Sequence, residues 1–81
     1  MNTYEVTQAK YIKNYIVNLT FNSGVSGNVN LKKYLGKGVF KELIDEEKFK
    51  KFELNKESGT ICWYTGADIA PDTLYAELKI K

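Results

Sequence analysis

The chain has 81 residues, 43% of them apolar, which suits one small domain spanning residues 1–81. The 12 basic residues are all Lys and face 10 acidic ones, so the net charge of +2 is too small to predict a polyanionic partner. The lack of His and Arg excludes His-based triads, His metal sites and bidentate Arg contacts to bases or phosphates. One cysteine, Cys62, can form no internal disulfide. We therefore expect no enzyme activity, no cofactor and no metal.

The first half of the chain predicts antiparallel strands. Residues 15–21 alternate, with apolar side chains at every second position, which is typical of a half-buried strand. The segment Asn22-Ser23-Gly24 then predicts a hairpin turn, and residues 25–29 the returning strand. Residues 4–9 alternate more weakly, and we expect them to join the hairpin as a third strand.

Two short helices are predicted next, at about 31–36 and 39–51. Asn30 is a suitable N-cap for the first helix, and Gly36 can end it. In the second segment Asp45 can cap a further turn, with acidic residues following it directly and lysines near its end, as the helix dipole favours.

Strands return at residues 52–55 and 60–63, where alternation and β-forming side chains recur. Pro71 is placed to open a short helix. The tail from Ala76 to Lys81 alternates again, which predicts a last strand at a sheet edge. Strands, helices and strands in this order indicate an α+β fold, a small and mostly antiparallel sheet with the short helices on one face.

The start of the chain carries no basic stretch followed by an apolar run, so no targeting or membrane segment is predicted. A free cysteine without disulfides fits the reducing cytosol. We expect a cytoplasmic protein without membrane contact.

Three groups of side chains could carry chemistry, and each has a simpler structural interpretation. Asp68 and Asp72 could act as paired carboxylates of a small hydrolase, but we favour capping and dipole roles at the helix that follows. Trp63 and Tyr64 could stack on bases or sugars, but we expect Trp63 in the core and Tyr64 partly exposed. Cys62 has no nearby activating group in sequence, so we expect a half-buried structural thiol.

The segment 32–51 holds seven lysines against four acidic residues. Such a patch can attract phosphates, although the interspersed acids favour a solvated helical face. The candidate nucleic-acid contacts are Lys32, Lys33, Lys37, Lys41, Lys48, Lys50 and Lys51.

Residues 63–75 read Trp-x-x-Gly-Ala-Asp-Ile-x-Pro-Asp-x-Leu-Tyr, and they are preceded by Gly38-Val39-Phe40 and by a strand that ends in residues 19–24. Together these pieces resemble the bacterial domain-of-unknown-function family two-four-four-two. The motif residues that carry the resemblance are Trp63, Gly66, Asp68, Pro71, Asp72 and Tyr75. Here Tyr64-Thr65 replaces the Pro-Asn expected after the Trp, and the tail after Tyr75 lies beyond the usual pattern.

The resemblance implies a small α+β fold without known enzyme activity. Some relatives carry a C-terminal helix-turn-helix, for which this chain is too short, and others are encoded beside a second small protein, as in toxin–antitoxin pairs. The leading hypothesis is therefore a non-catalytic interaction module, an antitoxin-like or regulatory member of a two-protein system. It would bind a small protein or a second copy of itself. The alternative is a nucleic-acid-associated accessory protein that uses the lysines of segment 32–51.

Overall fold

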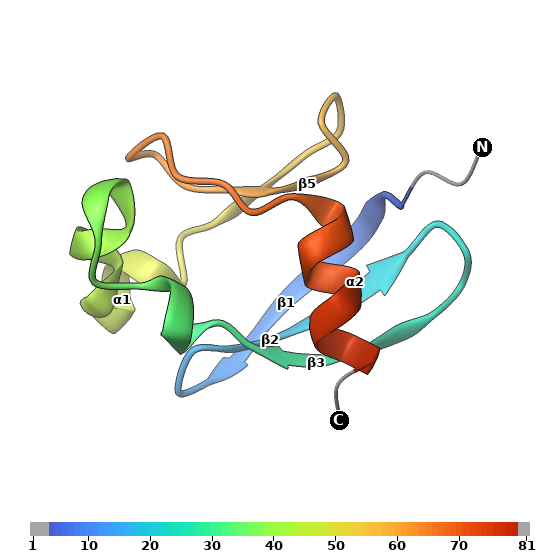
Figure 1. The fold of residues 1–81 in the computed structure, drawn as a ribbon, viewed down its shortest axis with the longest axis horizontal. Helices are drawn as coiled ribbons and strands as arrows, with labels where there is room; N and C mark the ends of the chain where they lie inside the picture. The colour runs from blue at the N-terminus through green and yellow to red at the C-terminus, as the bar shows by residue number, and fades with distance from the viewer. Residues whose placement is uncertain (1–3, 80–81) are drawn as a thin grey trace.

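The computed structural model describes residues 4–79 and contains two small antiparallel sheets (Figure 1). The first sheet has the order β1-β2-β3, with β1 at Val6–Lys13, β2 at Ile16–Phe21 and β3 at Ser26–Asn30. The predicted hairpin and the third strand are both confirmed. However, β1 continues four residues past the predicted end at position 9, so it forms a long edge strand.

Short helices follow β3, as predicted, and they form α+β architecture together with the sheets. They are η1 at Lys32–Tyr34, η2 at Gly38–Ile44 and α1 at Glu46–Phe49, and the first two are 3-10 helices. The predicted helix at 39–51 is thus divided at Asp45, whose side chain accepts a hydrogen bond of 3.0 Å from the Glu47 amide. A residue that caps a new helix cannot also continue the previous one, since its own backbone is extended.

The second sheet pairs β4, at Glu53–Asn55, with β5, at Thr60–Cys62. A hydrogen bond of 2.7 Å from the Val6 amide to the Gly59 carbonyl joins it to the first sheet. Gly59 has a φ of +69°, and a Cβ there would lie 2.9 Å from the Cγ of Glu5. Only glycine suits this junction without strain.

The predicted edge strand at the end of the chain is wrong. Helix α2 begins at Pro71, as expected, but it continues through Ala76 to Lys79; residues 80 and 81 lie outside the described part. Leu74 is fully buried and Leu78, one turn later, lies over Gly27 of β3. Because this pair has helical spacing and finds a sheet to cover, the helical packing overrides the alternating pattern.

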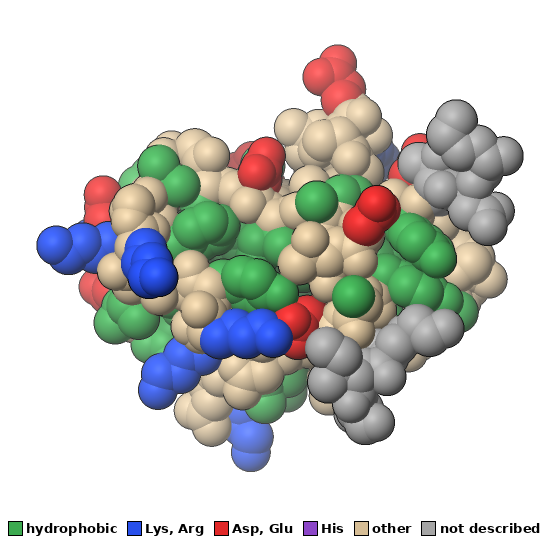
Figure 2. Space-filling view, in the orientation of Figure 1, with side chains coloured by type: hydrophobic (Ala, Val, Ile, Leu, Met, Phe, Trp, Pro, Cys, Tyr) green, Lys and Arg blue, Asp and Glu red, His purple; other side chains and the backbone are tan. Residues whose placement is uncertain are grey.

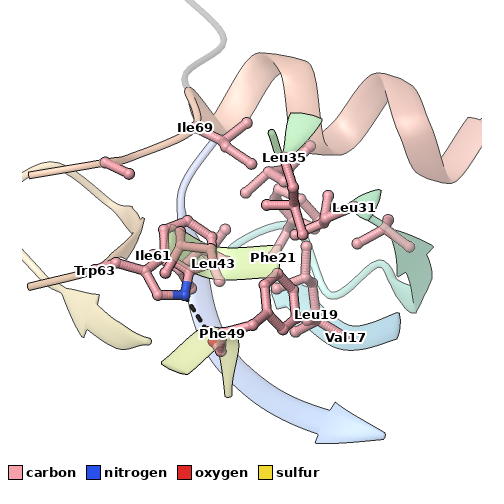
Figure 3. Close-up of a cluster of buried hydrophobic side chains, with 14 residues drawn as sticks. Val17, Leu19, Phe21, Leu31, Leu35, Leu43, Phe49, Ile61, Trp63 and Ile69 are labelled. Carbon is pink, nitrogen blue, oxygen red and sulfur yellow. Dashed lines mark hydrogen bonds between the residues drawn. The ribbon is translucent and has the colours of Figure 1, made fainter. Parts of the chain in front are cut away.

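The core lies between the two sheets and the helices, and Trp63 is one of its buried members (Figure 3). The residue is 3% exposed, and the centroid of its ring lies 5.6 Å from that of the Phe49 ring. Its Nε1–H donates a 2.7 Å hydrogen bond to the Phe49 carbonyl. Phe40 and Phe52 contact the same indole edge-on. The prediction that Trp63 belongs to the core is confirmed.

Candidate functional site

The motif residues at the end of the chain build a corner between β5 and α2. Gly66, at φ +92°, allows the tight turn after Trp63, and Pro71 starts α2 with Asp72 in its first turn. Tyr75 stacks on Tyr4 with ring centroids 4.1 Å apart. These contacts are internal, so the motif preserves the fold.

The two candidate carboxylates are both exposed and belong to different elements. Asp68 pairs with Cys62 in an isolated β-bridge, and Asp72 lies in α2. The Cys62 thiol is half-buried, as expected. Among residues 4–79 no three His, Cys, Asp or Glu side chains converge as metal ligands would.

The candidate lysines of segment 32–51 are not a uniform basic patch. Figure 2 shows lysine side chains gathered over the helical segments, with apolar side chains between them. Three of the seven lysines are paired with acids, namely Lys33 with Glu77, Lys48 with Glu42 and Lys50 with Glu47. Glu42 and Glu47 belong to segment 32–51 itself, so only Glu77, which comes from α2, lowers the charge excess that the sequence predicted.

A polar cluster that the sequence did not reveal joins η1 to α2. Glu77 accepts a 2.7 Å hydrogen bond from the Tyr34 hydroxyl and lies 2.6 Å from the Lys33 ammonium. The Lys33 contact and then the Tyr34 hydroxyl lower the pKa of Glu77. Partial burial and the nearby carboxylate raise the pKa of Tyr34 to about 12. The cluster fastens the end of α2, and a separation of 43 residues hides it from sequence reasoning.

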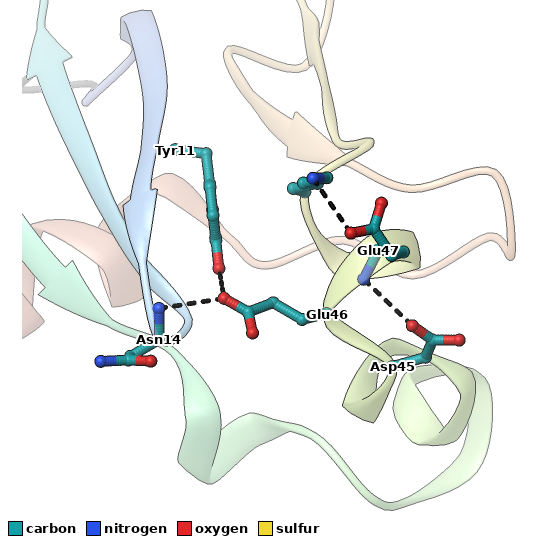
Figure 4. Close-up of polar contacts among 6 residues, drawn as sticks. Tyr11, Asn14, Asp45, Glu46 and Glu47 are labelled. Carbon is teal, nitrogen blue, oxygen red and sulfur yellow. Dashed lines mark hydrogen bonds and ion pairs between the residues drawn. The ribbon is translucent and has the colours of Figure 1, made fainter.

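A second unpredicted cluster supports the turn between β1 and β2 (Figure 4). Asn14 and Tyr15 both have positive φ, 50° and 67°, as a type I′ turn requires. The Glu46 carboxylate accepts hydrogen bonds from the Tyr11 hydroxyl and from the Asn14 amide, the latter at 3.1 Å. The Tyr15 hydroxyl donates to the Ile44 carbonyl. The segment 44–46, where η2 ends and α1 begins, therefore holds the end of β1 in place.

Strand β1 is one of the two edge strands of the first sheet, β3 being the other, and the register shows which backbone groups of β1 face outward. The Phe21 amide at the end of β2 donates a hydrogen bond to the Val25 carbonyl, and the Tyr15 carbonyl just before β2 accepts one from the Leu31 amide. Both bonds run toward β3, so the odd-numbered residues of β2 direct their N–H and C=O groups toward β3 and away from β1. Their partners on β1, Ala9 and Tyr11, must then direct their N–H and C=O groups away from the sheet. We call the stretch from Gln8 to Tyr11 the β1 edge.

Two lysines, one within the β1 edge and one just beyond it, lie on the outer face of the sheet, opposite the core. Lys10 pairs with Asn18, and Lys13 pairs with Ile16, both on the face that alternates with the buried positions of β2. Within residues 4–79 neither lysine takes part in an ion pair. The sequence reading missed this pair because it ended the strand at Ala9; the continuing β-formers Tyr11 and Ile12 were the available signal.

A hollow of about 350 Å³ lies next to this strand, where β1 meets the β4–β5 hairpin. Its lining combines apolar and charged side chains, with Val6 and Leu54 beside Glu5 and Lys56. Apolar side chains are also exposed elsewhere, among them Ile12 at 42%, Val39 at 51% and Tyr64 at 63%. Tyr64 is thus exposed, as predicted, and its hydroxyl bonds to Glu42.

None of the helices in the described part of the chain is both long and apolar enough to cross a membrane. Comparison with curated proteins and with solved structures gives no match. A family with the description "Protein of unknown function (DUF2442)" matches residues 6–79, nearly the whole chain, and this span contains the Trp-x-x-Gly-Ala-Asp-Ile-x-Pro-Asp segment of the sequence. The chain therefore belongs to this family of unknown function, whose fold is seen here as a three-stranded and a two-stranded sheet closed by α2.

Proposed function

We propose that the chain is a non-catalytic protein-interaction module of the bacterial cytoplasm, the antitoxin-like or regulatory member of a two-protein system. The observation that carries the proposal is the β1 edge, a row of outward backbone groups beside unpaired lysines and a hollow. An open edge of this kind can take an added strand. The exposed side chains of Ile12 and Val39 offer further apolar contact area.

Residue chemistry supports the non-catalytic part of the proposal. Without His, a proton-transfer site near neutral pH would depend on carboxylates, lysines, tyrosines or the one thiol, with perturbed pKa values. Among residues 4–79 the perturbed pKa values are those of Tyr34 and Glu77, which bond to each other and fasten α2, and that of Tyr64, which is exposed and bonds to Glu42.

The test is purification of the tagged full-length chain from its native cells, followed by light scattering. We expect a stoichiometric complex with one small protein, and a mass clearly above the 9.3 kDa of the chain. Recovery of a 9.3 kDa monomer alone, at concentrations near 100 μM, would contradict the proposal.

Nucleic-acid association is the second candidate, favoured by lysines of segment 32–51 that have no ion pair within residues 4–79: Lys32, Lys37, Lys41 and Lys51. Lys32 instead lies over the Tyr15 ring, 5.9 Å from its centroid. Fluorescence anisotropy with labelled single- and double-stranded oligonucleotides tests this role. Binding that weakens steeply between 50 and 200 mM NaCl supports it, and no binding at 50 mM NaCl excludes it.

A further inference from the structure

The β1 edge is available over a short stretch only. At one end the outward Val6 amide is already bonded to Gly59, and register shifts interrupt the ladder between Val6 and Gln8 and between Tyr11 and Lys13. Bulges of this kind bend a strand and limit further pairing. The N–H and C=O groups of Ala9 and Tyr11 remain, enough for a short added strand.

The positive charges of Lys10 and Lys13 favour an acidic partner strand over a second copy of the chain. In an antiparallel pair of two β1 strands centred on Lys10, the two Lys10 side chains would lie directly opposite each other, and like charges so placed are destabilising. A second copy of the chain is therefore disfavoured. A strand that places acidic side chains on the outer face, next to Lys10 and Lys13, would instead find two free ammonium groups.

The other face of the same added strand would be apolar. Ala9 and Tyr11 point to the core side, as the contact of the Tyr11 ring with Phe49 at 5.9 Å shows. Residues of the partner opposite them would share this side and extend toward the hollow lined by Val6 and Leu54. Acidic and apolar side chains would thus alternate in the partner.

From this geometry we infer that the β1 edge binds an extended, acidic segment of a partner protein, in which Glu or Asp alternates with apolar residues and which pairs antiparallel to β1. This inference rests on the proposed interaction function and names the site and the chemistry of the partner. Antiparallel pairing is the pattern of every strand pair in the described fold. The hydrogen-bonded positions of the partner would be its apolar residues, because they lie opposite Ala9 and Tyr11.

The test uses ¹⁵N-labelled full-length protein and a synthetic probe, acetyl-Val-Glu-Val-Glu-Leu-Glu-Val-amide. We expect amide shifts concentrated at Ala9 and Tyr11, with a dissociation constant below about 1 mM. The matched peptide with Lys in place of each Glu should bind at least tenfold more weakly. Methylation of the apolar residues' backbone nitrogens should abolish binding, whereas methylation of the Glu nitrogens should leave it nearly unchanged.

Charge reversal provides the protein-side control. Lys10→Glu with Lys13→Glu should exchange the preference, so that the Lys peptide binds better than the Glu peptide. Lys37→Glu with Lys51→Glu makes the same change in net charge on the helical segments and should preserve the original preference. The inference is overturned if no shift occurs at 1 mM peptide, if both methylated peptides bind equally, or if the two double variants behave alike.

The same variants separate this inference from the function on which it rests. If a stoichiometric partner from native cells binds the Lys10→Glu, Lys13→Glu variant as tightly as the wild type, the β1 edge is not the interface although the protein is an interaction module. If no partner exists but the peptide results hold, the edge is a real strand acceptor and the two-protein proposal fails.

Discussion

The buried hydrogen bond of Trp63 allows a sharp test of the core. Trp63→Phe retains an aromatic ring but removes the Nε1–H that bonds to the Phe49 carbonyl at 2.7 Å. Leaving a buried acceptor without its partner costs about 1–3 kcal/mol, and the smaller ring adds a void. We expect a loss of about 2 kcal/mol, against a total stability of about 4–12 kcal/mol for a chain of this length.

The assay is urea unfolding followed by far-ultraviolet circular dichroism, since Trp63 is the single Trp and its fluorescence is lost in the variant. With a slope near 1 kcal/mol per M urea, the midpoint should fall by about 2 M. Tyr64→Phe is the matched control, because it also removes one aromatic hydrogen bond, but from a side chain that is 63% exposed. It should change stability by less than about 0.5 kcal/mol. Equal shifts in the two variants would refute the assignment of the core.

Three further predictions concern the polar clusters and the junction of the sheets. The lowered pKa of Glu77 means that the stability contributed by its carboxylate is present above the ordinary Glu pKa and is lost as the pH falls through the folded-state pKa. The urea midpoints of wild type and Glu77→Gln should therefore differ at pH 7 and converge at pH values below the folded-state pKa of Glu77. In an absorbance titration at 295 nm the same variant should bring the Tyr34 pKa down from about 12. Gly59→Ala should cost about 1–3 kcal/mol in the same urea assay, because its φ is +69° and Glu5 is close, whereas Gly27→Ala meets only the flexible end of a leucine and should cost less than half as much. Glu46→Gln should lower the urea midpoint by about 1 M because its carboxylate accepts two hydrogen bonds, and a midpoint equal to that of wild type would contradict this role.

The strands and short helices could be predicted from the sequence because each has a local signal. Asp45 and Gly36 mark helix boundaries by their own chemistry, and alternation marks β2. The tail carried two signals at once, since Ala76 and Leu78 alternate while Leu74 and Leu78 have helical spacing. The helix prevails because Leu78 packs over Gly27 of β3, and this contact between distant parts of the chain cannot be predicted from the sequence of the tail.

The candidate site could likewise be predicted only as far as local sequence signals reach. The lysines of segment 32–51 were visible as a charge run, but the pairing of Lys33 with Glu77 depends on a contact across the fold. Conversely, Lys10 and Lys13 look unremarkable in the sequence and become informative only when β1 proves to be an edge. The order of the strands in a sheet cannot be deduced from composition. Whether a strand lies at the edge depends on which other strands pair with it in the folded chain.

The turn at Asn14 and Tyr15 has a consequence for the order in which the protein folds. A tyrosine in the left-handed region costs about 1–2 kcal/mol, and the groups that support the turn, on Ile44 and Glu46, follow 29 and 32 residues later. The turn between β2 and β3 needs no such support, because Gly24 adopts its positive φ freely. The β2–β3 hairpin should therefore form early, and β1 should close onto it only once the helical segment has docked. Loss of the Glu46 contact would then accelerate unfolding and leave the folding rate almost unchanged.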